Sequence, residues 1–145
     1  MVKIRRFRPA DAKDCESILK SNDQLSYPEI DGVKAMRRVY NKQGRYFLVA
    51  EEENSVAGLI RGTYDGSRAL IWELSVRPDY TCRGIGRKLV KELLKRFKED
   101  GAPTASVTVT EISEGYYKKI GFEETPVKLL ITEMKKKEKG SIAGV

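Results

Sequence analysis

Two glycines separated by one residue, Gly84 and Gly86, stand between an apolar run that ends at Val76 and the most regular amphipathic pattern of the chain. That pattern covers 85–98, where apolar residues recur every three or four positions and lysines occupy another face. A helix that begins at such a loop leaves its first N–H groups without intrahelical partners. Because these groups lie at the positive end of the helix dipole, the segment 76–97 predicts a site for the phosphates of a nucleotide-containing cofactor.

The size and composition of the chain predict a single soluble domain. A chain of 145 residues buries about two-thirds of the surface of its unfolded state. We expect one domain over residues 1–135 and a basic, flexible tail over 136–145. No run approaches the roughly 20 apolar residues of a membrane span, and the amino terminus carries no apolar stretch like that of a signal peptide. We therefore expect a cytoplasmic protein that does not contact a membrane.

The absence of histidine limits the chemistry of the chain more than any other compositional feature. It excludes Ser-His-Asp and Cys-His catalysis and removes the commonest general base and zinc ligand. The two cysteines, Cys15 and Cys82, are far apart, so we expect neither a disulfide framework nor a metal. Acid–base chemistry must then use carboxylates, tyrosines, lysines or water.

The net charge of +7 admits a polyanionic ligand, an acidic partner or nucleic acid. Part of the excess lies in the carboxy-terminal lysine run, and elsewhere basic residues alternate with acidic ones. We therefore do not expect nucleic acid as a partner. The oligomeric state is left open, a homodimer included.

Hydrophobic periodicity and turn residues predict a mixed sheet flanked by helices, an α/β (α+β) fold. Helical patterns cover 9–20, 29–41, 85–98 and 114–120. Strand patterns cover 3–8, 45–52, 55–63, 68–76 and 105–110, with a last strand at Val127–Met134. Short turns join the second, third and fourth strands, which predicts an antiparallel meander.

Two well-known phosphate-binding motifs do not fit the glycine loop. A dinucleotide fingerprint requires a third Gly or Ala where this chain has Leu89. A P-loop requires four residues between its glycines, followed by Lys-Ser or Lys-Thr, and neither feature is present. Both cofactor classes are excluded.

The loop instead resembles the acetyl-CoA-binding motif of the GCN5-related N-acetyltransferases (GNAT), whose pattern is Gln/Arg-x-x-Gly-x-Gly/Ala. Here the pattern reads Thr81-Cys82-Arg83-Gly84-Ile85-Gly86. Downstream, 116–122 is similar to the family's Leu/Phe-Tyr-x-x-Leu-Gly-Phe segment, and upstream 47–51 and 56–58 match its second and third strands. The resemblance covers nearly the whole chain. It is closest to small acetyltransferases of the YpeA and RimI type, which share the turn at Gly62–Gly66.

The resemblance implies a twisted, mostly antiparallel sheet in the element order β-α-α-β-β-β-α-β-α-β-β. It also implies an N-acetyltransferase that moves the acetyl group of acetyl-CoA directly to a primary amine of a small molecule or peptide. The backbone of the fourth strand would pair with the pantetheine arm, and the loop would hold the pyrophosphate. The implied cofactor residues are Leu74, Ser75, Val76, Thr81, Cys82, Arg83, Gly84, Ile85, Gly86, Arg87 and Lys88. Thr81 stands where the family has Gln or Arg, so we expect it to weaken binding.

The same resemblance implies that Tyr117 protonates the departing CoA thiolate. A phenol with a pKa of about 10 can donate to a thiolate whose conjugate acid has a pKa of about 8.5. The general base is open between Glu73, Glu111 and a water chain. Strict alternation places Glu73 on the sheet face opposite Trp72, whereas a bulge in this strand would change which residue points at the acceptor.

Two aromatic residues, Tyr27 and Trp72, are candidates to line the acceptor site. Cys82 is interpreted as a small loop residue rather than a nucleophile. Two other functions remain open: a noncatalytic acyl-CoA sensor that kept the loop but lost the chemistry, and a basic RNA- or ribosome-associated module that uses the lysine tail.

Overall fold

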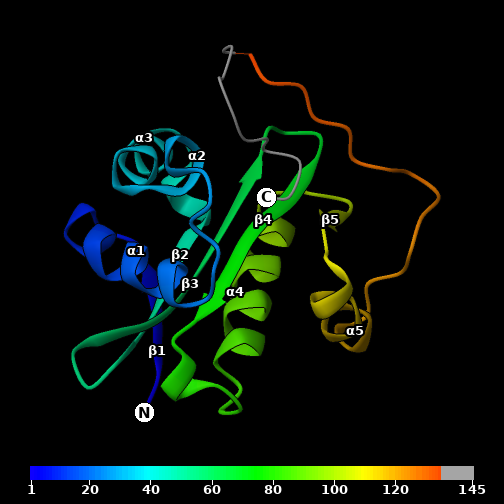
Figure 1. The fold of residues 1–145 in the computed structure, drawn as a ribbon. Coiled ribbons are helices and arrows are strands. Elements are labelled where there is room, and N and C mark those ends of the chain that lie inside the picture. Colours follow the sequence, from blue (N-terminus) through cyan, green and yellow to red (C-terminus); the bar gives the residue numbers. More distant parts are fainter. Residues whose placement is uncertain (135–145) are drawn as a thin grey trace.

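One five-stranded sheet forms the centre of the protein (Figure 1). The structure, a computed structural model, describes residues 1–134, so the basic tail expected at 136–145 lies outside it. Adjacent strands follow each other in sequence order, antiparallel except that β5 runs parallel to β4. The mixed, mostly antiparallel sheet expected from the sequence is confirmed. The strands are β1 (Lys3–Arg6), β2 (Phe47–Glu52), β3 (Ser55–Tyr64), β4 (Ala69–Val76) and β5 (Ala105–Val107).

Helices cover both faces of the sheet. One face carries α1 (Ala12–Ser21), α2 (Pro28–Asp31) and α3 (Val33–Gln43), and the other carries α4 (Ile85–Glu99) and α5 (Glu111–Ile120) (Figure 1). Each face has its own buried apolar cluster. The apolar stripes expected on the first and fourth helices are the buried faces of α1 and α4. Three short 3₁₀ turns lie at Pro9–Asp11, Gly44–Tyr46 and Pro78–Tyr80.

Two helix boundaries differ from the expected ones because of local capping. The helix expected at 29–41 is divided at Gly32, whose extended backbone (φ −80°, ψ 179°) separates α2 from α3. A Cβ on Gly32 would lie 2.6 Å from the carbonyl oxygen of Pro28, so the break requires glycine. The last helix begins three residues earlier than expected, because the side chains of Thr110 and Ser113 form a capping box.

The strand expected at Val127–Met134 is wrong: this segment forms no strand in the described part of the chain. After α5 the chain loops outward and returns toward the top of the view (Figure 1). Leu130 and Met134 are about 90% exposed. Only three residues of β5 are in the sheet before the chain turns toward α5. The short β5 therefore offers this segment little edge to pair with, although its sequence favours a strand.

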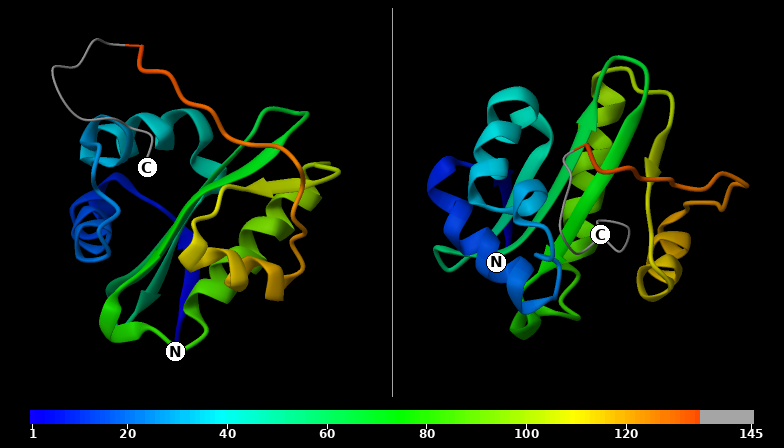
Figure 2. Two further views of the ribbon diagram at one scale, coloured as in Figure 1. Left: turned by 45° about the vertical axis from the view of Figure 1, so that its right-hand side comes forward. Right: turned by 45° about the horizontal axis from the view of Figure 1, so that its top comes forward.

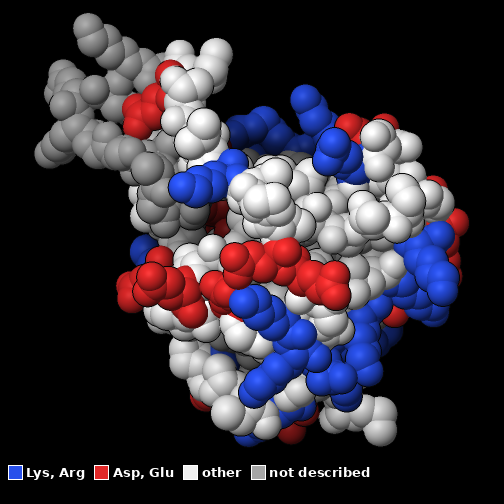
Figure 3. Space-filling view, turned by 90° about the vertical axis from the view of Figure 1, so that its right-hand side faces the viewer, with Lys and Arg blue, Asp and Glu red and all other residues white. Residues whose placement is uncertain are grey.

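The face that carries β5 and α5 bears both signs of charge. A row of acidic side chains lies directly beside a group of basic ones (Figure 3), and Lys118 pairs with both Glu114 and Glu124. Within residues 1–134 no helix has the length and apolar character needed to cross a membrane.

Candidate functional site

The loop between β4 and α4 is built around two residues with positive φ. Gly84 is the N-cap of α4 at φ 76°, a left-handed conformation that glycine adopts without steric cost, and Cys82 has φ 65°. Among the described residues no side chain caps this helix, and its first intrahelical bond runs from the Lys88 N–H to the Gly84 carbonyl at 3.1 Å. The three preceding amides of the first turn are thus available to an anion.

The side chains of this loop are arranged around those amides. Arg83 is held to one side, 3.6 Å from Glu52 and 4.7 Å above the ring of Tyr80. Thr81, where the family has Gln or Arg, donates its hydroxyl to the carbonyl of Pro78 at 3.0 Å. Cys82, Arg87 and Lys88 are exposed. Of the three basic residues in the implied cofactor set, Arg83 is engaged by other protein groups, whereas Arg87 and Lys88 make no ion pair within residues 1–134.

The edge of β4 that precedes the loop is open. β5 pairs with β4 only over Ala69–Ile71, and the two strands then diverge (Figure 2). On the other edge, the Arg77 N–H donates to the carbonyl of Ala57 at 2.8 Å. Backbone groups of successive strand residues point to alternate edges. Because Arg77 points toward β3, its neighbour Val76 and the next alternate residue, Leu74, direct their carbonyls to the open edge. This is the edge that the sequence assigned to the pantetheine arm.

Two residues that the sequence did not single out reach this edge from the loop after α1. The side-chain amide of Asn22 donates to the Ser75 hydroxyl at 2.7 Å and to the Val76 carbonyl at 2.8 Å. The side-chain amide of Gln24 donates to the Leu74 carbonyl at 3.2 Å. Polar residues after a helix are so common that no sequence signal marks these two.

A bulge in β4 overturns the strict alternation of its side chains. Arg61 of β3 pairs with Glu73, but its neighbour Gly62 pairs with Ile71. Trp72 therefore has no partner in β3 and is the extra residue of the bulge. Trp72 donates its indole N–H to the hydroxyl of Thr63 at 2.8 Å and remains 44% exposed. As a result, Trp72 and Glu73 both lie on the sheet face of α1–α3. Strict alternation is therefore wrong for Trp72, which does not share a face with Leu74 and Val76.

Glu73 belongs to a charged cluster contributed by three elements. Asp31, the last residue of α2, lies 3.5 Å from the guanidinium of Arg61, and both are more than 90% buried. The Oε1 atom of Glu73 is buried and has no hydrogen-bond partner within residues 1–134. Burial raises the pKa of Glu73 well above its usual value, the positive charge of Arg61 opposes this, and the carboxylate of Asp31 adds to it.

Two further candidate residues, Glu111 and Tyr27, do not belong to this cluster. Glu111 lies apart from it, and Tyr27 lies at its rim. Glu111 is the first residue of α5, exposed, and on the sheet face opposite that of Glu73. Tyr27 is half-buried and directly precedes α2, the helix that supplies Asp31. The structure thus brings Glu73 and Trp72 to one face with the α2 region and separates them from Glu111.

The two tyrosines of α5 have different surroundings. Tyr117 is only 5% exposed and packs edge-on between Tyr116 (5.2 Å) and Phe122 (5.5 Å) in the apolar cluster of α4. Burial, with a smaller contribution from Tyr116, raises the pKa of its phenol strongly. The Tyr116 hydroxyl is also buried, without a hydrogen-bond partner in the described chain, and it lies against Gly86 of α4.

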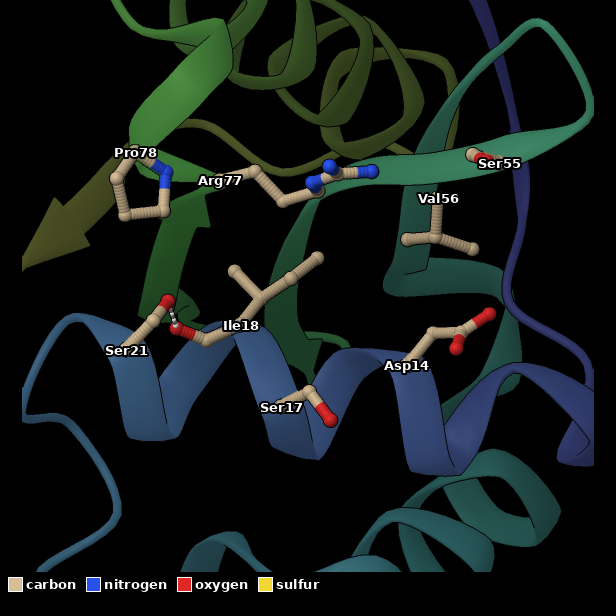
Figure 4. Close-up of a pocket in the computed structure, with 8 residues that line it drawn as sticks. All are labelled: Asp14, Ser17, Ile18, Ser21, Ser55, Val56, Arg77 and Pro78. Atoms are coloured by element: carbon tan, nitrogen blue, oxygen red, sulfur yellow. Dashed lines mark hydrogen bonds between the residues drawn. The ribbon is translucent and has the colours of Figure 1, made fainter.

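A separate hollow of about 330 Å³ lies between α1, the beginning of β3 and the residues that follow β4 (Figure 4). Asp14 and Arg77 approach it from opposite walls, together with the hydroxyl-bearing residues Ser21 and Ser55 (Figure 4). Arg77 already pairs with Asp79 at 2.7 Å. The hollow lies on the α1 face of the sheet, whereas α4 covers the opposite face, and we assign the hollow no part in the chemistry. Within residues 1–134 no three His, Cys, Asp or Glu side chains group as metal ligands.

The features around β4 and α4 fit a long ligand that carries both amides and a pyrophosphate. The open strand edge offers backbone groups to the amides, and the uncapped first turn of α4 offers N–H groups to the phosphates. The hydroxyl of Tyr116, buried and without a hydrogen-bond partner within residues 1–134, lies against Gly86 in the first turn of α4. Coenzyme A has this composition.

Comparison with known proteins agrees with this geometry. Solved structures with the same fold include Ard1 from Thermoplasma volcanium (TM-score 0.77, 23% identity, 86% of this chain and 84% of that one). They also include the GNAT-family acetyltransferase SP0256 from Streptococcus pneumoniae (0.70, 25%, 91% and 98%). A third is the PaiA N-acetyltransferase from Thermoplasma acidophilum in complex with coenzyme A (0.73, 19%, 88% and 93%). The model of the acetyltransferase (GNAT) family matches residues 16–122, and the protein therefore belongs to the GNAT family, as an N-acetyltransferase whose donor is acetyl-CoA.

Proposed function

We propose that this enzyme acetylates a primary amine of a small molecule or a peptide by direct transfer from acetyl-CoA, with Glu73 as the general base. The observation that carries the assignment is the buried, unpartnered carboxyl oxygen of Glu73 beside the bulge of β4. A buried polar atom without a partner costs free energy, so its retention favours a functional role.

The donor side of the proposal rests on the loop and on the strand edge. The first-turn amides of α4, with Arg87 and Lys88 beside them, would hold the pyrophosphate, and the backbone at Leu74 and Val76 would hold the pantetheine amides. Ser75 would not contact the cofactor through its side chain, because its hydroxyl is buried and accepts from Asn22. Thr81 and Arg83 would act through the shape of the loop, since protein groups already engage both.

The acceptor side rests on the charge of the cluster. With both carboxyls ionised, a state that the raised pKa of Glu73 favours only as the pH rises, Asp31, Arg61 and Glu73 carry one net negative charge, which suits an ammonium group. A lysine-like amine must lose a proton at a cost of about 3.4 pKa units at pH 7, roughly 4.6 kcal/mol, against about one unit for an α-amine. A carboxylate with a raised pKa accepts this proton more readily than an ordinary one does. Tyr27 and Trp72 would form the rim of the acceptor site.

A thiol-release assay tests the proposal. Purified enzyme and acetyl-CoA are offered polyamines, amino acids, aminoglycosides and peptides with free N-termini, and native mass spectrometry detects co-purified CoA. We expect CoA release that depends on one class of amine and acetylated product in the mass spectrum. Glu73→Gln should lower kcat/KM by about 10²-fold or more, whereas the matched variant Glu111→Gln should leave it within about twofold.

Three results would contradict parts of this proposal. Tight CoA binding without transfer to any amine would identify the noncatalytic sensor. Equal loss of activity in both variants would remove Glu73 as the base. Salt-sensitive RNA binding that requires the residues after Met134 would favour the basic module.

A further inference from the structure

Glu52 lies at the end of β2, and its carboxylate reaches the loop that leads from β4 into α4 (residues 77–84, the donor loop). The Oε2 atom of Glu52 is buried and has no hydrogen-bond partner within residues 1–134. A guanidinium nitrogen of Arg83 lies 3.6 Å from this atom, a distance that makes an ion pair but no hydrogen bond. A buried carboxylate oxygen without a hydrogen bond costs free energy, so its retention favours a role beyond packing.

Arg83 belongs to a group of charged and aromatic side chains in the donor loop. The guanidinium carbons of Arg77 and Arg83 lie 4.8 Å and 4.7 Å from the ring centre of Tyr80. Each guanidinium also has a carboxylate partner: Asp79 lies 2.7 Å from Arg77, and Glu52 pairs with Arg83. Asp79 belongs to the loop itself, whereas Glu52 belongs to a strand that is paired on both sides. The ion pair of Glu52 therefore ties the end of the loop to the sheet.

The backbone on both sides of Arg83 is in the left-handed region, with φ 65° at Cys82 and 76° at Gly84. Glycine adopts this conformation readily, whereas a residue with a side chain, such as Cys82, adopts it at a cost in free energy. Such a conformation persists where surrounding contacts fix it. The side chain of Arg83, held by Tyr80 and Glu52, supplies contacts of this kind between the two positions. Because Gly84 is also the N-cap of α4, the shape of the loop sets the path by which phosphates approach the first-turn amides.

We infer that Glu52 is a positioning residue for acetyl-CoA binding, which holds Arg83 and thereby keeps the donor loop in the shape that receives the pyrophosphate. This inference rests on the donor site proposed above. It predicts an effect opposite in sign to that of charge alone. A carboxylate near phosphates repels them, so its neutralisation should tighten binding if Glu52 acted only as a charge. If Glu52 acts by fixing Arg83, its neutralisation should weaken binding instead, because the ligand must then order the loop.

Glu52→Gln tests this sign, because it removes the charge of the side chain while keeping its length. The Kd of CoA, measured by calorimetric titration, should rise about threefold to fivefold, a modest change because the Arg83 side chain is 55% exposed. The KM of acetyl-CoA should rise with it, whereas kcat at saturating acetyl-CoA should stay within about twofold of the wild-type value. In the free protein, the amide NMR signals of Cys82 and Gly84 should shift, because the loop loses its tie to β2.

Two comparisons separate this role from general electrostatics. Glu53→Gln removes the same charge from the next residue, which is exposed and makes no ion pair within residues 1–134, so it should not raise the Kd of CoA. Arg83→Gln removes the partner of Glu52. In this background Glu52→Gln should no longer weaken binding, which a double-mutant cycle on the Kd of CoA measures.

A Kd for Glu52→Gln at or below that of the wild type would overturn the inference, and so would equal weakening with and without Arg83. A fall in kcat with an unchanged Kd would also overturn it, because Glu52 would then affect the chemistry and not donor binding. If the wild type binds no CoA, the proposed donor site fails and this inference fails with it. If the wild type binds CoA but acetylates no amine, the proposed acetylation fails, while the Kd values still decide the role of Glu52.

Discussion

Gly84 supports the sharpest test of the donor loop, because its backbone conformation alone decides the cost of replacing it. It has φ 76°, and a Cβ there would meet no atom within 4 Å. Gly84→Ala therefore creates no clash and changes only the backbone energy. An L-residue in the left-handed region costs about 1–2 kcal/mol, and the lower entropy of alanine in the unfolded chain offsets roughly 0.4–1 kcal/mol of this. We expect a net loss of about 1 kcal/mol, or about 3 °C in Tm for a chain of this length.

The same substitution should also affect CoA. The free variant can relieve the strain by leaving the left-handed conformation, and CoA must then restore it. The affinity for CoA should fall by up to about tenfold, the equivalent of 1.4 kcal/mol. Urea denaturation measures the first effect and calorimetric titration with CoA the second. Gly84→Asn should fall between the wild type and the alanine variant, because asparagine tolerates this conformation better than alanine does.

Gly86→Ala is the matched control for this prediction. Gly86 lies inside the helix, where alanine is favoured over glycine by about 1 kcal/mol, and a few tenths of an ångström of movement by the Tyr116 hydroxyl accommodates the new methyl group. This variant should be at least as stable as the wild type. If the two alanine variants were equally stable, the left-handed conformation of Gly84 would not be the cause of the predicted loss of stability in Gly84→Ala.

Three further predictions follow from contacts described above. Glu73→Gln should be more stable than the wild type at pH 8 but not at pH 4, as measured by urea denaturation. The pKa of this carboxyl is higher in the folded protein than in the unfolded chain. The wild type therefore loses stability as the pH rises through the interval between these two values, whereas glutamine does not titrate. Asn22→Ala, which removes two hydrogen bonds, should lower the free energy of unfolding by about 1–3 kcal/mol, and Gln24→Ala, which removes one, by about 0.5–1.5 kcal/mol. Gly62→Ala should cost about 3 kcal/mol or more, seen as poor soluble yield or a low Tm, because its Cβ would lie 2.6 Å from the Leu70 carbonyl oxygen.

Features that depend on neighbours in the chain were predictable from the sequence. The apolar stripe of α4 lies in the order of its residues, because the helical period alone places Leu89 and Leu93 on one face. The left-handed cap is equally local, since glycine is the residue that adopts it at least cost. The loop that begins α4 could therefore be located from the sequence, whereas its part in holding acetyl-CoA stays a prediction.

Features that depend on contacts between distant segments were not predictable. The bulge at Trp72 exists only relative to the register of β3, so the sequence left strict alternation and a bulge both open and could not place the extra residue. Asp31, Arg61 and Glu73 meet because α2 lies over β3 and β4, and no spacing in the sequence encodes that meeting. The strand expected at Val127–Met134 shows the converse: its local preference was correctly recognised, but a strand also requires a neighbouring edge.

The open edge of β4 also has a consequence for the enzyme before it meets its donor. Unpaired strand edges promote association between molecules, and proteins protect them with charges, bulges or covering segments. Here the carboxamides of Asn22 and Gln24 occupy the carbonyls of Val76 and Leu74. These two side-chain hydrogen bonds occupy carbonyls that would otherwise be open to another strand, so we expect a ligand that pairs with this edge to compete with both carboxamides.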